Sequence, residues 1–581
     1  MTLLRVVRTF RPAAPGRPKG LHYIVPVLLC AGLLTATPSA QRGSPAATLV
    51  ITNGKVLNAD GTFSEAIAMG GTQILRVGST RDISALLSPA TRVIDAHGRA
   101  VVPGFIDSHV HFMIGGESLE QVNLRGTRTQ EEARERLTAF VASHKEAAWI
   151  RGANGYGRLT GADLDEIIPD RPAFIVSGDV HSLLANKRAL AAAGVTRTTP
   201  DPPNGKIVRD EKTGEATGLM LEAAQGLVTR AVPSPTREER RRTLKAAMDE
   251  AHRSGVTSIV NIGGPDDIAL FDEARRTGNL SVRIYSALWV APGGGDSAFP
   301  VSVNATDADL DHFEEIRRQY RNDDLLKVGA IKIMLDGVIE SRTAAMLEPY
   351  LDVNSKGTPT LPPERLRQIV ARMDKSGWQI ITHALGDGAI RLALDTYEAA
   401  ERVNPAPPQG RRHRIEHLEA TSASDIPRFA SLGVIASLQP AHARGMLNPS
   451  PTGGRITSIG PERHASGWPW KSIADAGGRI IFGSDWPVAS LNPLGSFYVP
   501  ITRAPRPGVA DQRLSMTAVI DAYTKTGAWA EFDEAKKGTL EAGKLADVVI
   551  LSKDVFADPP TTADAVAVDT TVFNGQVVFS R

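Results

Sequence analysis

The stretch GFIDSHVHF (residues 104–112) ends an apolar run with two histidines that lie two residues apart. The run predicts a β-strand, and residues i and i+2 of a strand point to the same face. His109 and His111 can therefore direct their side chains at one point. Neutral imidazole is the commonest metal ligand in proteins, but a His-x-His pair by itself is a weak signal. Its meaning depends on the partners that the remainder of the chain supplies.

Short apolar runs alternate with amphipathic helical patterns, such as 238–253 and 363–376, through the middle of the chain. After the strand that ends at His109, seven further runs predict strands at residues 255–260, 282–290, 328–334, 378–382, 414–416, 434–438 and 479–482. This alternation predicts an α/β fold, a (β/α)₈ TIM-like barrel over residues 105–529. Residues 121–234 do not follow this alternation of strands and helices. They are rich in glycine, proline and charged residues, so we interpret them as an insertion after the first strand.

Both ends of the chain carry a different, β-rich pattern. Short strand-like runs separated by turn residues fill residues 46–104, and residues 530–581 repeat the pattern in the runs 543–551 and 569–578. Because these two segments flank the predicted barrel, we expect them to form one small composite β-sandwich domain.

Residues 1–40 have the pattern of a secretory signal peptide. Five basic residues and no acidic one are followed by an apolar stretch at 23–34 and by small residues up to Ala40. The apolar stretch is short for a permanent anchor, so we expect its removal, no stable membrane span afterwards, and a periplasmic or secreted protein. The single cysteine, Cys30, lies in this segment, which excludes disulfides, cysteine-bound zinc and a cysteine nucleophile from the mature chain.

The charge balance argues against a nucleic-acid-binding protein. The 581-residue chain has 66 lysines and arginines against 64 aspartates and glutamates. Without the five basic residues of the leader, 61 basic residues face 64 acidic ones, and no basic patch remains. We expect a small-molecule substrate as partner, and a homo-oligomer is compatible with the sequence.

Polar side chains recur towards the C-terminal ends of the predicted strands, where barrel enzymes place their chemistry. The fourth strand carries Lys332, and the fifth, sixth and eighth end at His383, His417 and Asp485. Each has an ordinary explanation on its own, as a hydrogen-bonded loop residue, a lysine that extends outward or a helix cap. The same criterion, a position towards the C-terminal end of a predicted strand, selects these four residues and the histidine pair. The sequence therefore predicts a metal site at one rim of the barrel.

These motifs together resemble the metal-dependent amidohydrolase superfamily. The resemblance covers nearly all of the mature chain and rests on residues 103–111, the Lys332 strand, Thr382-His383-Ala384, Ile415-Glu416-His417, Gly483-Ser484-Asp485 and residues 543–547. More narrowly, the chain resembles amidohydrolase family 3, the branch that includes N-substituted formamide deformylases. The branch features are the long insertion, Asp201-Pro202-Pro203 with Gly205, Asp336-Gly337 with Ser341-Arg342-Thr343, and Ser484-Asp485-Trp486-Pro487.

The resemblance implies roles for the six strand-end residues. His109, His111 and Asp485 would hold one divalent metal ion, and His383 and His417 a second. Lys332 would bridge the two as a carbamate, although a single ion is an open alternative. Zn²⁺ suits this ligand set best, with Mn²⁺, Fe²⁺ or Co²⁺ as alternatives. The implied enzyme is a hydrolase of non-peptide carbon–nitrogen bonds, in which metal-activated water attacks an amide carbonyl and Asp485 is the general base and acid.

The sequence says less about the substrate and leaves other reactions open. The weaker substrate-binding candidates lie on predicted loops over the rim: Tyr156, Arg158, His181, Arg342, Gln439, His442 and Trp486. The same site could hydrolyse a lactone, a carboxylic ester or a phosphoester. A metal-bound binding protein without turnover is a further alternative, against which Asp485 argues, because a purely structural metal needs no general base.

Overall fold

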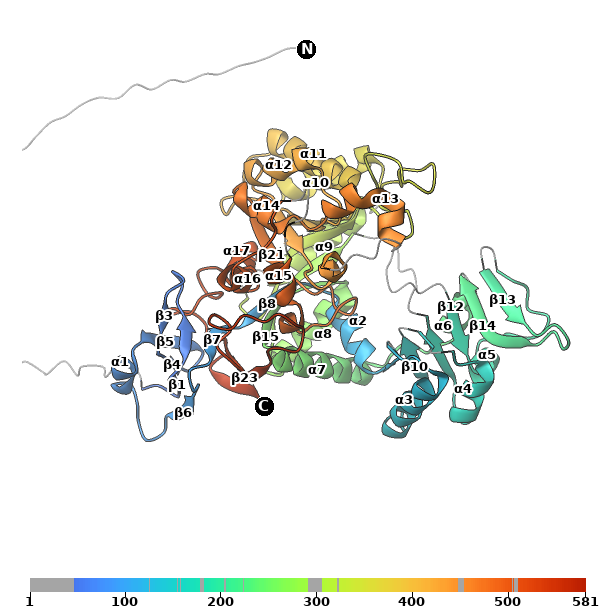
Figure 1. The fold of residues 1–581 in the computed structure, drawn as a ribbon, viewed down its shortest axis with the longest axis horizontal. Helices are drawn as coiled ribbons and strands as arrows, with labels where there is room; N and C mark the ends of the chain where they lie inside the picture. Colours follow the sequence, from blue (N-terminus) through green and yellow to red (C-terminus); the bar gives the residue numbers. More distant parts are fainter. Residues whose placement is uncertain are drawn as a thin grey trace, which may run out of the picture. The chain divides into compact units, whose positions relative to one another are not determined.

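The computed structural model describes residues 46–581 except 125, 154, 157, 178–181, 203–204, 223, 291–305, 321–322, 448–453, 504 and 506–509. Its centre is an eight-stranded, all-parallel sheet in sequence order (Figure 1). The strands are β8 (Phe105–Val110), β15 (Val256–Gly263), β16 (Arg283–Trp289), β17 (Leu326–Met334), β18 (Gln379–Ala384), β19 (Arg414–His417), β20 (Ile435–Leu438) and β21 (Arg479–Phe482). All eight predicted strands are therefore present, and the predicted barrel is confirmed.

The barrel closes where the first strand meets the segment after the last one. The backbone amide of His111 donates to the Trp486 carbonyl at 2.9 Å, and the amide of Asp485 donates to the His109 carbonyl at 2.7 Å. Val110 and Trp486 form a parallel bridge between the same segments. Three of the predicted metal ligands, His109, His111 and Asp485, therefore lie on the closing seam itself.

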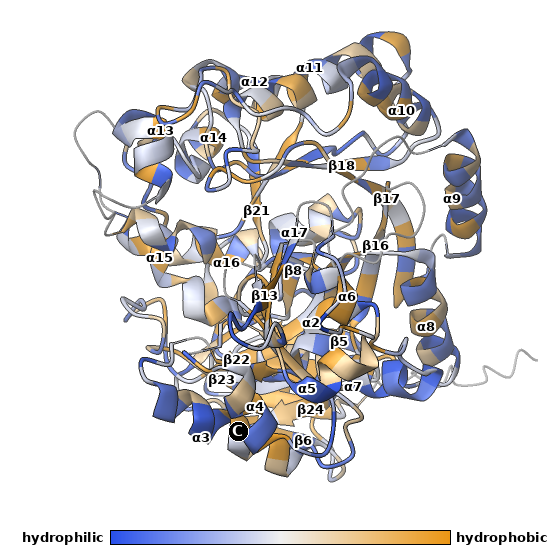
Figure 2. Ribbon diagram, turned by 90° about the vertical axis from the view of Figure 1, so that its right-hand side faces the viewer, coloured by the Kyte–Doolittle hydropathy of each residue, from blue (hydrophilic) through white to orange (hydrophobic). Residues whose placement is uncertain are grey.

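Helices between the strands cover the barrel and present one apolar face to it. In Figure 2 the barrel strands are largely hydrophobic, whereas the outer helices are mixed in hydropathy. Helix α10 (Pro363–Lys375) shows the reason, because its buried residues follow helical spacing: Leu366, Ile369, Val370 and Met373. The other covering helices are α7 (Arg237–Arg253), α8 (Pro265–Arg276), α9 (Asp307–Tyr320), α11 (Asp387–Val403), α12 (Ile426–Ser431), α14 (Trp470–Asp475), α16 (Met516–Ala522) and α17 (Lys525–Ala530). Among the described residues, no helix is long and apolar enough to cross a membrane.

The insertion after β8 and helix α2 (Phe112–Leu119) forms a sheet of its own, with strand order β13-β14-β12-β11-β10-β9 (Figure 1, teal). Its strands are β9 (Val122–Asn123), β10 (Ile150–Ala153), β11 (Ala173–Val176), β12 (Ser182–Ala185), β13 (Gly205–Arg209) and β14 (Ala216–Glu222). Its helices are α3 (Gln130–Ser143), α4 (Gly161–Ile167), α5 (Lys187–Ala192) and α6 (Gln225–Thr229). Separate clusters of buried apolar residues lie against this sheet.

The two chain ends share a pair of sheets, as the sequence predicted. A four-stranded sheet holds β1 (Leu49–Thr52), β4 (Ala66–Gly70), β5 (Gln73–Gly78) and β6 (Arg92–Asp95). A six-stranded sheet holds β2 (Lys55–Leu57), β3 (Phe63–Ser64), β7 (Ala100–Pro103), β22 (Val548–Leu551), β23 (Val568–Phe573) and β24 (Gln576–Ser580). Strand β7 lies between β2 and β22, and one buried apolar cluster contains residues from both sheets.

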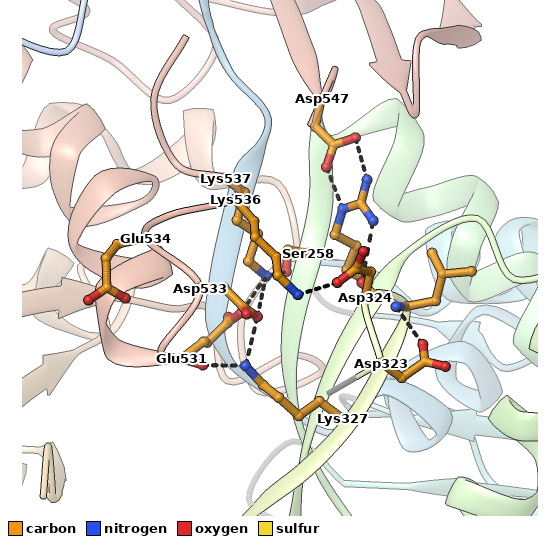
Figure 3. A network of polar contacts seen from close by, with 12 residues as sticks. Ser258, Asp323, Asp324, Lys327, Glu531, Asp533, Glu534, Lys536, Lys537 and Asp547 are labelled. Carbon is orange, nitrogen blue, oxygen red and sulfur yellow. Dashed lines mark hydrogen bonds and ion pairs between the residues drawn. The ribbon is translucent and has the colours of Figure 1, made fainter. Parts of the chain in front are cut away.

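An ion pair and buried hydrogen bonds join this double sheet and the segment after α17 to the N-terminal ends of the barrel strands (Figure 3). Asp547, directly before β22, accepts hydrogen bonds from Arg283 at 2.7 and 3.1 Å. Lys537 donates to Ser258 of β15 and to Glu531, each at 2.5 Å. These contacts fix one end of the barrel and leave the opposite end, where the strands finish, for the functional site.

Candidate metal centre

A cavity of about 840 Å³ opens at the C-terminal ends of the barrel strands. All six strand-end residues of the predicted metal site line it: His109, His111, Lys332, His383, His417 and Asp485. The remaining wall is mostly apolar and includes Trp289, Met334, Val338, Leu385, Met446, Ile456, Trp468 and Val488. The volume is in the ordinary range for a small-molecule site.

The first group of potential ligands consists of His109, His111 and Asp485. The Nε2 atoms of both histidines lie 3.4 Å from Oδ1 of Asp485, and the ligand atoms of all three residues lie within 4.8 Å of one another. The Lys332 Nζ lies 3.2 Å from His109 Nε2. The predicted His-x-His pair, the lysine and the carboxylate therefore meet at one point.

Glu416 fixes the orientation of His109. The Nδ1 of His109 lies 2.5 Å from Oε2 of Glu416, and both side chains are fully buried. Arg414 donates to the same carboxylate at 2.9 and 3.1 Å. Neither residue was predicted to have a role of its own, although two opposite charges two residues apart in a buried barrel strand were a usable signal.

A second group consists of His417, His442 and Asp485, whose ligand atoms also lie within 4.8 Å of one another. His417 and Asp485 have left-handed backbone conformations, with φ of 78° and 59°, which turn these strand ends towards the cavity. The Nδ1 of His417 lies 2.9 Å from the amide oxygen of Gln439. Gln439, predicted to contact substrate, is instead fully buried behind His417.

His383 lies beside these two groups of potential ligands. Among the described residues, it belongs to neither group. Its ring centroid is 4.5 Å from that of His417, and its Nε2 lies 3.8 Å from Oδ1 of Asp336. Asp336 accepts hydrogen bonds from the backbone amides of Leu385 and Gly386 at 3.0 and 2.9 Å. Asp336 of the Asp336-Gly337 motif therefore holds the loop that directly follows the strand of His383.

Burial keeps the imidazoles neutral, which is the form that binds metal. It lowers the pKa of His109 to about 4 and that of His383 to about 3, with the charge of Lys332 adding to both shifts. The pKa of His417 lies well below its ordinary value, also through burial. Burial opposes ionisation of Asp485, but His109 and its neighbours hold the pKa of this carboxyl well below its usual range. Neutral imidazoles around an ionised carboxylate fit a divalent cation.

Of the weaker candidates, only His442 is among the described residues that line the cavity. The Trp486 ring packs against Phe112, with centroids 6.0 Å apart. Arg342 donates from Nε to Asp352 at 3.0 Å.

Two of the insertion candidates are described, and neither lines the cavity. The Tyr156 hydroxyl lies 3.0 Å from Ser182 Oγ. Arg158 has a left-handed backbone with φ of 66° and is also absent from the described lining. His181 lies outside the described residues. The substrate roles of these three residues stay predictions.

Comparisons with known proteins agree with this architecture. The chain is 33% identical over 527 residues to Protein LONG AFTER FAR-RED 3 of Arabidopsis thaliana, covering 87% of each chain. It is 25% identical over 532 residues to an N-substituted formamide deformylase of Arthrobacter pascens, covering 87% of this chain and 93% of that one. An uncharacterised metal-dependent hydrolase from Pyrococcus furiosus shares the fold, with a TM-score of 0.70 at 23% identity over 87% of this chain and 99% of that one. A profile of the amidohydrolase family matches residues 92–579, so the chain belongs to the amidohydrolase family and is a metal-dependent hydrolase of carbon–nitrogen bonds.

Proposed function

We propose that this enzyme hydrolyses a non-peptide amide of a small molecule, with Zn²⁺ held by His109, His111 and Asp485. The observation that carries the proposal is the convergence of these three side chains, with ligand atoms within 4.8 Å of one another, in a cavity of about 840 Å³. Lys332, His383 and His417 complete the proposed ligand set for one or two ions. The apolar wall favours a substrate whose non-reacting part is largely apolar.

Asp485 is the proposed general base and acid. When bound, a divalent ion supplies a Lewis acid that polarises the carbonyl and makes water more acidic. The ionised Asp485 carboxylate takes a proton from the attacking water while the new carbon–oxygen bond forms. It then gives that proton to the leaving nitrogen as the carbon–nitrogen bond breaks, so that a carboxylic acid and an amine are released.

We also propose that Lys332 carries a carbamate. Its side chain is fully buried, and burial lowers the pKa of its amine to about 8, which leaves a fraction of the amine neutral and reactive towards CO₂ near neutral pH. The carbamate would replace a buried cation by an anion with two oxygen ligands. Isotope-labelled bicarbonate should give a carbamate signal in the NMR spectrum of the wild type and none in Lys332→Ala. A Lys332→Ala variant with full metal content and full activity would exclude the bridging role.

The experiment that tests the reaction is metal analysis of the purified enzyme combined with a panel of amides, lactones, esters and phosphoesters. We expect bound zinc and the highest kcat/KM on amides. Asp485→Asn should lower kcat by at least about 100-fold, whereas Asp249→Asn, at an exposed position of α7, should not. A clear preference for lactones or phosphoesters would replace the proposed reaction, and bound metal without turnover on any class would favour a binding protein.

We propose further that residues 1–40 direct the protein out of the cytoplasm and are then removed. The basic, apolar and small-residue segments of this stretch support the proposal. N-terminal sequencing of the mature protein from fractionated cells tests it. A protein that keeps residues 1–40 and stays with the cytoplasmic fraction would contradict it.

A further inference from the structure

Part of the cavity wall is polar without belonging to the proposed metal ligands. Arg455, in the first turn of α13 (Gly454–Ala465), and Trp468 both line the cavity, and they are only 9% and 3% exposed. The guanidinium of Arg455 lies 4.7 Å from the ring centre of Trp468. The two side chains therefore form one continuous piece of the wall, which is otherwise mostly apolar.

Each of these two side chains has one buried N–H group without an acceptor. Neither Nε1 of Trp468 nor Nε of Arg455 has a hydrogen-bond partner among the described residues. Indole and guanidinium nitrogens donate hydrogen bonds but cannot accept them. Because a buried donor without a partner costs free energy, a ligand that brings an acceptor to this part of the wall gains affinity. We call Arg455 and Trp468 together the donor corner.

The charges around the donor corner argue for an uncharged acceptor. The Nη atoms of Arg455 donate to Oε2 and to the backbone carbonyl of Glu419. Oε1 of Glu340 lies 3.7 Å from Nη1 of Arg455, and both glutamates line the cavity. One cation therefore faces two carboxylates, which repel a further anion. A cationic group has no lone pair to offer to the two N–H groups, so a neutral oxygen satisfies both conditions.

The backbone holds the donor corner close to the proposed metal centre. The amide of Trp468 donates to the carbonyl of Leu418 at 2.9 Å, and Leu418 directly follows the proposed ligand His417. Arg503 donates to the Trp468 carbonyl at 2.8 Å. Since the corner and the ligand are joined through adjacent backbone, the corner can contact a substrate group at a set distance from the bond that is cleaved.

We infer that the donor corner selects substrates that carry an uncharged oxygen acceptor, a ketone or an ether oxygen, in addition to the amide that is cleaved. Trp468 and Arg455 are specificity-determining residues, because they contact the substrate away from the reacting atoms. The remainder of the substrate packs against the apolar wall. The inference rests on the proposed function, since it adds a substrate class to the same cavity.

A series of matched amides tests the inference. The series keeps one amide constant and places a methylene, a ketone, a carboxylate or an ammonium group at successive positions of the acyl chain. In the wild type, the ketone at its best position should have a kcat/KM about 5- to 10-fold above that of the methylene compound, the effect of one hydrogen bond. The carboxylate and ammonium compounds should have a lower kcat/KM than the methylene compound.

Trp468→Phe removes the indole N–H and keeps an aromatic ring beside Arg455. The ratio of kcat/KM between the ketone and the methylene compound should therefore fall towards one in this variant. The matched control is Trp149→Phe, at a ring that packs against Phe174 with centroids 6.2 Å apart and is not among the described residues that line the cavity. This control should keep the wild-type ratio.

Calorimetric binding of the same compounds separates this inference from the proposed reaction. If no amide is cleaved, but the wild type binds the ketone more tightly than the methylene compound and Trp468→Phe does not, the proposed reaction is wrong and the donor corner stands. If amides are cleaved but the wild type does not distinguish the ketone from the methylene compound at any position, the inference is overturned and the reaction stands. This comparison needs no variant. A preference for the carboxylate, or a ratio that Trp468→Phe leaves unchanged, also overturns the inference.

Discussion

Glu416 shows how one buried carboxylate prepares a histidine for metal. Burial opposes its ionisation, but the charge of Arg414 and the hydrogen bond from His109 outweigh this and lower the pKa of Glu416 to about 2. The carboxylate is therefore charged wherever the protein is folded near neutral pH. It accepts the Nδ1 proton of His109 and so leaves the lone pair on Nε2, the atom that faces Asp485.

Glu416→Gln should weaken zinc binding by about 10- to 100-fold. An amide oxygen is a weaker acceptor for the imidazole N–H than a carboxylate, and in the flipped orientation the amide presents its NH₂ group, which cannot accept. Competition with a chromophoric chelator measures this. The matched control is Glu364→Gln, at a glutamate whose side chain is 75% exposed, and it should leave the affinity unchanged. Equal zinc affinity in Glu416→Gln and the wild type would show that His109 needs no such partner.

At the scale of an element, strand β21 must approach β8 very closely to deliver Asp485. A Cβ built on Gly483 would lie 2.7 Å from the His109 backbone nitrogen and 3.0 Å from a carboxylate oxygen of Asp107. The next amide, of Ser484, donates to that same oxygen at 2.9 Å. The Gly483-Ser484-Asp485 motif is therefore a packing requirement of the closing seam as well as a source of a ligand.

Gly483→Ala should force the two segments apart and move Asp485 away from the histidines. We expect a loss of about 1–3 kcal/mol in stability and a drop of about 100-fold in kcat/KM. Gly264→Ala is the matched control, because a Cβ there meets no atom within 4 Å. Thermal unfolding and steady-state kinetics measure both effects; wild-type kinetics in Gly483→Ala would mean that the seam tolerates a wider spacing.

The strands were predictable because most of the parallel barrel strands are largely apolar and buried on both faces. Their C-terminal ends then selected His109, Lys332 and Asp485. The sheet of the insertion was not predicted, since its short strands lie in a stretch rich in turn formers and charge. The contact between His417 and Gln439 was also out of reach. It joins separate segments of chain through side chains, and no periodicity encodes such a contact.

Helix α10 is tied to the segment before β19 by one buried carboxylate. Asp374 accepts hydrogen bonds from Asn404 and Arg411 at 2.8 Å and lies 3.1 Å from His413 Nε2. Burial alone would raise the pKa of Asp374, but these hydrogen bonds, first that of His413, outweigh it and lower the pKa to about 2. Because the folded-state pKa is below the unfolded one, the stabilisation is complete above about pH 4 and is lost as the pH falls towards about 2.

Asp374→Asn should therefore lower the unfolding temperature at neutral pH, and the difference from the wild type should shrink in acid. The pKa shift corresponds to about 2 kcal/mol, and the unpaired Arg411 adds to the loss. Calorimetry of both proteins at about pH 7 and about pH 3 measures it. If the difference in unfolding temperature between the variant and the wild type does not change with pH, the charge of the carboxylate does not contribute to stability.

At the scale of the whole molecule, the ion pair of Arg283 and Asp547 connects the barrel to the sheet formed by both chain ends. Arg283 begins β16 and Asp547 precedes β22, and their side chains are 3% and 6% exposed. Asn574 joins the pair, since its backbone amide donates to Asp547 at 2.9 Å. The closing motif at residues 543–547 thus has a structural reason, because it places this carboxylate beneath the barrel.

Asp547→Leu and Arg283→Met should each destabilise the protein by about 3–5 kcal/mol, because each leaves one charge buried without its partner. The double variant should lose less stability than the sum of the two single variants, because neither charge then remains.

The exposed pair of Lys245 and Asp249 in α7 is the matched control, and its single variants should change stability by less than about 1 kcal/mol. Unfolding temperatures of the four proteins in each cycle measure the coupling. Additive effects at Arg283 and Asp547 would mean that the two parts are joined by their apolar contacts and not by this pair. Strong coupling would instead mean that this ion pair fixes the N-terminal end of the same barrel whose closing seam positions Asp485.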